Sequence, residues 1–520
     1  MKSYKLLIGA LVFSLTSCSD SFLEILPESY INEVEFFSTA GELNIALNAC
    51  YAGMRAPAAE EWKFTELRSD NTAMNQIATT SVDNIFFLSY DAFFVSTNDT
   101  NLKNFWYYTY VNIKNNNILL NKMNVNYDGT AIVYGANATT IAAADIKDVA
   151  SQACFLRAYH YFNLVRLFGD VFLVHEPVAS SDASILNRAP QASVYNLIIA
   201  DLLSSIANGN SAKYSSITAT NAGKANVWAA KALLAKVYLT LGRKAESLAL
   251  TTDIIANSGY DLESTAARVY ATTNELNKEI LFTIRYKSGN IGLGSPFTCD
   301  FAPAATTGGV TVTGNQGDNA PTVELYNSFN ATDGRRAFVG QSADVSLPRK
   351  LYYTKFHAAQ TVRNDSEFDF PIIRYADVLL MYAEAAGRAD ANSLVNINKV
   401  RTRATGLTSL VASNIDTDAK FNLALANERR WEFAGENQRW YDLLRYGTTL
   451  PTLNAVDVMR QHLIIDMQPL LYSFYTDNAE NVTPAILSAR VNANSMFLPI
   501  PQIELDTNNT ITITQNAGYN

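Results

Sequence analysis

The chain has 520 residues, of which 48% are apolar and 17% are charged, a composition typical of a folded globular protein and not of a disordered one. Its formal net charge of −9 argues against a partner that presents nucleic-acid phosphates, because such partners require a basic surface. The length would accommodate two or three domains of ordinary size.

The N-terminus has the pattern of a signal peptide that ends at a lipidated cysteine. Two lysines precede an apolar run at residues 6–15, which is too short for a membrane span of roughly 20 residues. Small residues then lead directly into Cys18, as in a bacterial lipoprotein box. We expect residues 1–17 to be a signal peptide and residues 18–30 to be a tether whose acyl chains hold the protein on a membrane. An ordinary signal peptide with a chance cysteine is the alternative.

Apolar residues recur at helical spacing through much of the remaining chain, so we predict a mainly helical fold. Small residues line several of these helices, such as Ala229, Ala232 and Ala235 ahead of Gly242, where a glycine lets the next helix fold back. This is similar to tetratricopeptide repeats, in which stacked helix pairs bury a continuous core, although the spacing is irregular here. Alanine-rich packed helices without a repeat are the alternative. The expected helices cover residues 42–54, 104–123, 146–168, 194–205, 226–241, 244–258, 374–388, 393–404 and 419–433.

Two segments depart from the helical pattern. Residues 59–103 contain runs of Asn, Asp, Thr and Ser, and residues 281–370 are rich in Gly and include a strand-like run at 310–313. We predict that both are loops and short strands carried on the helical scaffold, and that the tail at 452–520 is irregular.

Residues 428–447 combine eight charged residues with five aromatic residues in a helical pattern that a turn interrupts near Gly435. A solvated helix face needs no such aromatics, and a core helix excludes so many charges. We interpret the charged residues as a buried ion-pair network that fixes the register of the helices, with a ligand site as the alternative. The members of this structural signature are Arg374, Asp377 and Glu384, which share a helix face, with Arg401, Arg403, Glu432, Glu436 and Arg439.

Several blocks in a fixed order resemble the SusD/RagB family of outer-membrane lipoproteins of Bacteroidetes. The family often has Pro where this chain has Phe172, a local departure that leaves the resemblance intact. The blocks are Ser21-Phe22-Leu23-Glu24, Leu47-Asn48-Ala49-Cys50-Tyr51, Ser69-Asp70-Asn71, Arg157-Ala158-Tyr159, Phe168-Gly169-Asp170, Arg374-Tyr375-Ala376-Asp377, Val400-Arg401, Leu498-Pro499-Ile500-Pro501 and Thr514-Gln515-Asn516.

The resemblance implies one SusD-like domain at residues 31–520 and a role in binding. Such proteins sit on the cell surface, capture oligomeric nutrients and act as a lid over a TonB-dependent transporter of the SusC/RagA type. Most studied members handle glycans, and RagB-like members handle peptides. Both ligand classes therefore stay open, as does a helical-repeat scaffold that assembles other proteins.

The residues themselves point to no catalytic centre, cofactor or metal. The four histidines are scattered without metal-ligand spacing, and we find no Gly-x-Ser-x-Gly elbow, phosphate loop or His-Glu-x-x-His motif. Without Cys18, three cysteines remain, which give no complete disulfide framework, and Cys50 and Cys154 are expected to be small core residues. We therefore expect a binding protein and not an enzyme.

Ligand contacts are expected on loops that the scaffold presents, where aromatic rings can stack on sugars. Four tryptophans fall within helical patterns and are assigned to the core, so Trp62 is the one loop candidate among the five. An exposed arc of aromatics around a pocket would favour a glycan ligand, a polar cleft ringed by backbone donors a peptide, and a smooth face a scaffold. The six candidate ligand residues are Asp70, Asn71, Tyr90, Phe93, Tyr286 and Phe297.

Overall fold

The computed structural model describes residues 37–74, 82–136, 141–179, 182, 185–302, 317–341, 351–358, 360–464, 483–508 and 510–519. Cys18, the expected tether at 18–30 and the strand-like run at 310–313 lie outside the described residues. Within the described residues the chain is mostly helical, as predicted, and no helix there is long and apolar enough to cross a membrane.

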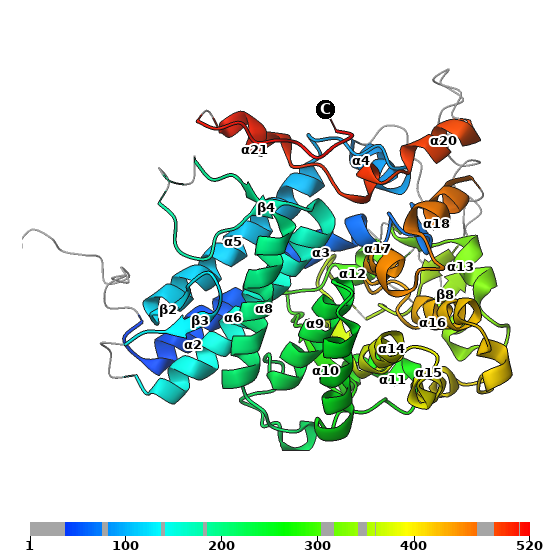
Figure 1. Cartoon of the computed structure of the whole chain (residues 1–520), viewed down its shortest axis with the longest axis horizontal. Coiled ribbons are helices and arrows are strands. Elements are labelled where there is room, and N and C mark those ends of the chain that lie inside the picture. Colours follow the sequence, from blue (N-terminus) through cyan, green and yellow to red (C-terminus); the bar gives the residue numbers. More distant parts are fainter. Residues whose placement is uncertain are drawn as a thin grey trace, which may run out of the picture.

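The first group of long helices stands side by side at the left of Figure 1. Its members are α2 (Ala40–Gly53), α5 (Thr100–Lys122), α6 (Ala143–Phe168) and α8 (Gln191–Asn208). α6 is the central helix of the group, because every residue from Val149 to Phe168 is buried. A helix that is buried on all sides needs neighbours all round, and α6 packs against α2, α5, α8 and α9.

The second group continues the pattern of helix pairs at the centre and lower right of Figure 1. α9 ends before Gly242, whose φ of 72° turns the chain so that α10 folds back on α9. α10 packs on α14, and α14 packs in turn on α15 and α16, which confirms the predicted scaffold of stacked helices. The bounds are α9 (Val227–Thr240), α10 (Lys244–Asn257), α14 (Tyr375–Ala386), α15 (Ala391–Arg403), α16 (Asp418–Glu432) and α17 (Arg439–Thr449).

The prediction of loops at 59–103 is wrong in part. α3 (Arg55–Thr65) and α4 (Val82–Asp91) are helices within this region. Trp62 was a loop candidate, but it lies on α3 with 1% of its surface exposed, and its ring packs edge-on against Phe301 at 5.6 Å. The polar composition misled the prediction because polar residues such as Glu61 and Glu66 are buried and accept from Tyr441 and from the backbone of Asn437, far along the chain.

The region at 281–370 was predicted as loops and short strands, and its described residues form short strands together with short helices that were not predicted. Each sheet among the described residues has two antiparallel strands, and β10 pairs with β6 so that Phe370 lies opposite Ile284. The pairs are β1 (Thr72–Ala73) with β7 (Ala320–Pro321), β2 (Val125–Tyr127) with β3 (Ile132–Tyr134), β4 (Val171–Phe172) with β5 (Arg188–Ala189), β6 (Ile280–Ile284) with β10 (Phe370–Arg374), and β8 (Val339–Gln341) with β9 (Leu351–Tyr353). The short helices are α11 (Ala266–Val269), α12 (Phe297–Phe301) and α13 (Val323–Ser328).

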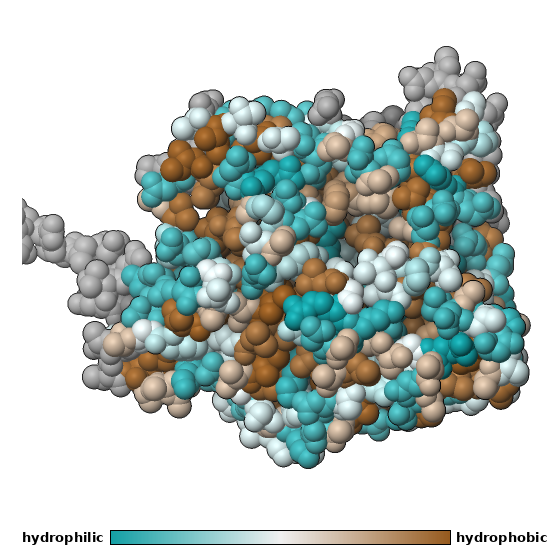
Figure 2. Space-filling model, viewed as in Figure 1, coloured by the Kyte–Doolittle hydropathy of each residue, from teal (hydrophilic) through white to brown (hydrophobic). Residues whose placement is uncertain are grey.

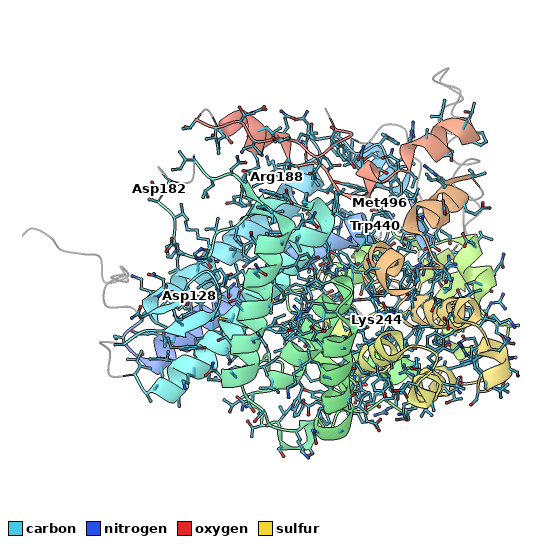
Figure 3. All side chains as sticks on the ribbon, in the orientation of Figure 1. Asp128, Asp182, Arg188, Lys244, Trp440 and Met496 are labelled. Carbon is cyan, nitrogen blue, oxygen red and sulfur yellow. The ribbon has the colours of Figure 1, made fainter. Side chains whose placement is uncertain are left out.

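The C-terminal segment crosses the top of the molecule in Figure 1 and carries α18 (Ala455–His462), α20 (Pro484–Arg490) and α21 (Gln502–Thr507). Arg188, labelled below this segment in Figure 3, donates to the carbonyl of Thr514 at 2.6 Å and to Oδ1 of Asn516 at 2.5 Å. The backbone N–H of Leu498 donates to the carbonyl of Leu167 at 2.7 Å. The described part of the tail is therefore tied to the end of α6 by hydrogen bonds.

One continuous cluster of buried apolar side chains runs from Leu43 on α2 to Ile513 near the C-terminus. Trp106, Trp228 and Trp440 belong to it, and Trp431 packs against it half-buried, close to the core assignment of these four residues. Cys50 and Cys154 are buried free thiols, as predicted.

Candidate ligand-binding groove

Asp70 and Asn71 are buried in the protein interior and do not present a ligand-binding loop. Both carboxylate oxygens of Asp70 accept from Arg439, at 2.7 and 2.9 Å, and Oδ1 of Asn71 accepts from Nε of Arg430 at 2.6 Å. Burial alone would raise the pKa of Asp70, but Arg430 and Arg439 hold this pKa well below its usual range. Both side chains are therefore bound by arginines of the interior. The prediction that Asp70 and Asn71 contact a ligand is wrong.

The four aromatic candidates are also core residues. Tyr90 packs edge-on against Phe64 at 5.0 Å, and the rings of Phe297 and Phe370 lie 4.3 Å apart. A ring enclosed in this way has no free face for a sugar, so the structure places none of the four at a surface. The exposed fractions are 0% for Tyr90, 7% for Phe93, 3% for Tyr286 and 0% for Phe297.

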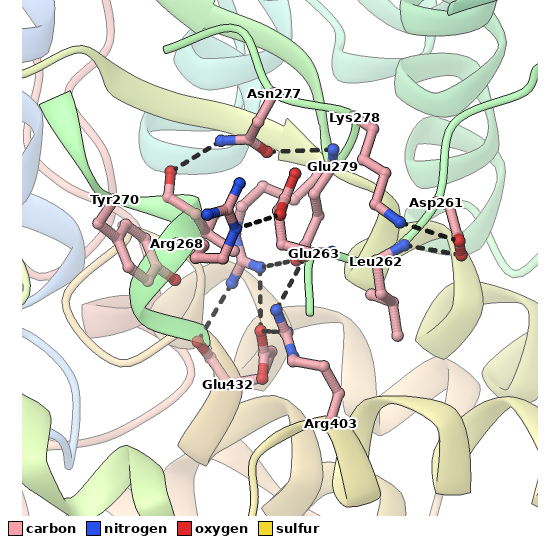
Figure 4. Close-up of polar contacts among 12 residues, drawn as sticks. Asp261, Leu262, Glu263, Arg268, Tyr270, Asn277, Lys278, Glu279, Arg403 and Glu432 are labelled. Carbon is pink, nitrogen blue, oxygen red and sulfur yellow. Dashed lines mark hydrogen bonds and ion pairs between the residues drawn. The ribbon is translucent and has the colours of Figure 1, made fainter. Parts of the chain in front are cut away.

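The signature residues meet in a buried ion-pair network, part of which Figure 4 draws. Arg374, 1% exposed, lies 2.6 Å from Glu279, 2.9 Å from Glu432 and 2.7 Å from Glu436. Arg403 joins it by pairing with Glu279 at 2.8 Å and with Glu432. Burial alone would raise the pKa of Glu432, but Arg403, Arg374 and other cations hold it well below its usual range. The network links β10, α15, α16 and the segment before β6.

The remaining signature residues make further buried pairs. Asp377 accepts from Arg429 at 2.8 Å, and Glu384 lies 2.7 Å from Arg445. Arg401 is the most exposed member and reaches Glu428 at 3.3 Å. None of these carboxylates is left over for a ligand. The sequence-based interpretation did not include Glu279, Arg335 and Asp333 as members, since they lie outside the recognisable blocks and their positions become adjacent only in the fold.

A groove of about 580 Å³ with aromatic walls lies on α5. On α5, Trp106 and Tyr110 are four residues apart, so their rings lie on one helix face with centroids separated by 5.0 Å. Phe172 of β4 completes this floor, 5.7 Å from Trp106, and its carbonyl accepts from the hydroxyl of Tyr110 at 2.9 Å. Asp99 starts α5 by accepting from the backbone N–H groups of residues 101 and 102, which sets the direction of this face.

Polar side chains form the rim of the groove, and the ring of Tyr107 is exposed beside them. Tyr107 has 60% of its surface exposed. Burial raises the pKa of Glu504, although a hydrogen bond from the Trp106 side chain opposes this. Figure 2 shows hydrophobic residues gathered on this face, at the upper left, around a hollow beneath the C-terminal segment. The polar and charged residues that line the groove are Lys114, Glu504, Thr507 and Asn508.

This combination suits a ligand that has both apolar faces and hydroxyl groups. A sugar ring can stack on aromatic side chains while carboxylate, amide, hydroxyl and ammonium groups bind its hydroxyls. The sequence contains a signal for the groove in the aromatic run at 105–108, which opens a predicted helix, but we assigned Trp106 to the core. Trp106 is indeed 2% exposed, so it supports the floor of the groove from the protein interior. Tyr107 provides the exposed ring. Among the described residues no group of three or more His, Cys, Asp or Glu could hold a metal ion.

Comparison with known proteins identifies the family. Residues 21–239 match the family described as starch-binding associating with outer membrane, and residues 340–519 match the family described as SusD. SusD-like protein P2 of Formosa agariphila is 30% identical over 493 residues, which cover 86% of this chain and 91% of that relative. The chain belongs to the SusD family. A SusD-like protein of Bacteroides ovatus is 24% identical over 98% of this chain and 97% of its own length.

Solved structures show the same SusD fold. A laminarin-binding SusD-like protein has a TM-score of 0.70 at 22% identity, with 94% of this chain and 100% of that chain covered. Surface glycan-binding protein A from Bacteroides thetaiotaomicron, solved in complex with laminarihexaose, has a TM-score of 0.71 at 19% identity over 92% and 99% of the two chains. At these identities the likeness concerns the fold alone.

Proposed function

We propose that this SusD-family protein binds oligosaccharides at the surface of the outer membrane and delivers them to a TonB-dependent, SusC-like transporter. The observation that carries the glycan part is the α5 groove, in which the aromatic floor and the exposed ring of Tyr107 face a polar rim. The proteins of known structure named above bind laminarin or laminarihexaose, which supports a glycan as the ligand class. The role is capture and transfer, without a catalytic step.

Lipidation of Cys18 would hold the protein on the membrane beside such a transporter. The lipoprotein box supports this anchor, and the family description associates its members with the outer membrane. A tether at 18–30 would then join the anchor to the helical scaffold and let the groove face the cell exterior. Peptides are the alternative ligand, and the groove favours glycans over them because aromatic rings and polar side chains line it together.

The proposal is tested by a binding screen of the purified protein against glycan and peptide panels, followed by substitution of Tyr107. Tyr107→Ala removes an exposed ring without opening the core, so we expect affinity for the bound glycan to fall about tenfold, as for loss of one stacking anchor. Isothermal titration calorimetry measures the change.

Leu423→Ala is the control. Leu423 lies on α16 with 52% of its surface exposed and does not line the groove, so its substitution removes an exposed apolar side chain elsewhere. Equal losses in both variants, or binding that is confined to the peptide panel, would contradict the proposal.

A further inference from the structure

Two adjoining pockets are lined in part by the connection between α8 and α9, a segment that runs at the bottom of Figure 1, and they share no lining residue with the α5 groove. Their volumes are about 280 and 310 Å³. Both are lined by Ala222, Gly223, Lys224 and Thr283, so the segment 222–224 forms the wall between them. Gly223 adopts a φ of 77° and lies against the side chain of Arg285, which lets the chain turn between the two pockets.

The smaller pocket is lined by cations and by no carboxylate. Its cations are Arg55, Lys224 and Arg285. Nε of Arg55 donates to the carbonyl of Arg285 at 2.7 Å, and no carboxylate of the described residues forms an ion pair with Arg55. Nζ of Lys224 reaches only Oδ1 of Asn44, at 3.5 Å. A cationic pocket is unexpected in a chain with a net charge of −9, and its composition fits an anionic group.

The nearby carboxylates do not neutralise the charges of Arg55 and Lys224. Arg285 pairs with Glu275 at 2.8 Å and with Asp369 at 2.6 Å, so its own charge is compensated outside the pocket. Asp148 of α6 is attracted by Lys224 but does not line either pocket and lies beyond ion-pair distance. Arg55 and Lys224 therefore remain available to clamp an oxyanion from two sides.

The larger pocket offers a place for the uncharged part of the same ligand. The rings of Tyr214 and Tyr260 lie there with centroids 5.2 Å apart. Asn221 and Asn226 add amide groups, and Nδ2 of Asn226 donates to the hydroxyl of Tyr260 at 3.1 Å. The half-buried ring of Tyr214 beside these amides suits a sugar ring, and Tyr260, which is 5% exposed, packs against it.

We infer that the paired pockets form a second binding site for an acidic saccharide, with its carboxylate or sulfate group between Arg55 and Lys224 and its ring beside Tyr214. The inference rests on the proposed function, since it names acidic glycans as a ligand class. A free inorganic anion would bind between Arg55 and Lys224 in the same way, but it would make no contact in the pocket that Tyr214 lines.

The test titrates the purified full-length protein with four probes: a short uronate oligosaccharide, its carboxyl-reduced neutral counterpart, a short sulfated oligosaccharide and inorganic sulfate. We expect at least one acidic saccharide to bind in a salt-dependent manner, more tightly than the neutral counterpart or sulfate alone. Lys224→Gln and Arg55→Gln should each weaken this binding about tenfold, because each removes one charge-assisted contact. Lys399→Gln, on the exposed side of α15, removes the same charge elsewhere and should leave the affinity unchanged.

Each other outcome overturns the inference. Acidic saccharides that do not bind, or that bind the two variants as tightly as the native chain, exclude an anionic subsite at these residues. Sulfate that binds as tightly as the acidic saccharides identifies a free-anion site. Neutral glycans that bind through Tyr107 while acidic ones do not would leave the proposed function standing without this site, whereas failure of all glycans removes both.

Discussion

At the residue scale, burial decides whether a charged side chain has a structural role or a binding role. Arg374 uses Nε and both terminal nitrogens in bonds to three carboxylates, and Asp70 uses both oxygens in bonds to Arg439. Groups that are satisfied in this way have no capacity left for a ligand. By contrast, Arg55 and Lys224 line an open pocket without a carboxylate partner among the described residues, and we assign the binding role to such groups.

Removal of Arg374 should destabilise the protein strongly. Arg374→Ala leaves Glu279, Glu432 and Glu436 buried close together without their shared cation, which costs about 3–5 kcal/mol in the free energy of unfolding. Urea denaturation of the native chain and the variant measures the difference.

The exposed ion pair of Arg388 with Asp418 is the control for this loss. Its side chains are 41% and 79% exposed, so Arg388→Ala should change the free energy of unfolding by less than about 1 kcal/mol. If both variants lose the same stability, the buried network has no special role.

At the element scale, helices were predicted well where an apolar stripe is present and poorly where polar residues are buried. α6 and α10 begin and end within a few residues of the prediction, since their apolar spacing is sufficient to define them. α3 was missed because its buried face includes Glu61, which accepts from Tyr159 and Tyr441, and Lys63, which donates to Asn101. Local pattern cannot anticipate such partners.

The turn between α16 and α17 offers a test at this scale. Gly435 has a φ of 81°, and a Cβ there would lie 2.7 Å from the ring of Phe356. Gly435→Ala therefore combines a left-handed backbone with a clash, and we expect a loss of about 2 kcal/mol or more, measured by thermal and urea denaturation.

Substitution of Gly447, further along the chain on α17, should have the opposite effect on stability. It lies exposed on α17, and a Cβ there would meet nothing within 4 Å. Gly447→Ala should stabilise the protein by about 0.5–1 kcal/mol, because alanine favours the helix. A destabilised Gly447→Ala variant, or an unaffected Gly435→Ala variant, would refute this account of the turn.

At the scale of the whole molecule, one apolar cluster joins the N-terminal helices to the C-terminal segment. The long-range hydrogen bonds of Arg188 and Leu498 tie the tail across the end of α6. The α5 groove exists only because the tail returns to this place, since Glu504, Thr507 and Asn508 form its rim. The proposed role also needs the whole molecule to be held at a membrane.

Cys18→Ala should release the protein from the membrane, because it removes the proposed site of acylation. Fractionation of cells that express the native chain or the variant measures the distribution between membrane and soluble fractions. Cys50→Ala removes a buried thiol elsewhere and should stay with the membrane. Retention of the Cys18→Ala variant in the membrane fraction would disprove the lipoprotein assignment.

The sequence by itself was sufficient for the family resemblance, the helical scaffold and the interpretation of the signature residues as ion pairs. The resemblance rests on short sequence blocks in a fixed order, the scaffold on the spacing of apolar residues, and the ion pairs on charged residues set among aromatics, all of which can be read along the chain. Tertiary structure alone decided which residues are open to a ligand. The core contains Tyr90, Phe93, Tyr286 and Phe297. The accessible residues include Tyr107, Arg55 and Lys224. Exposure depends on which distant segments pack together, and those contacts are not encoded in the spacing of neighbouring residues.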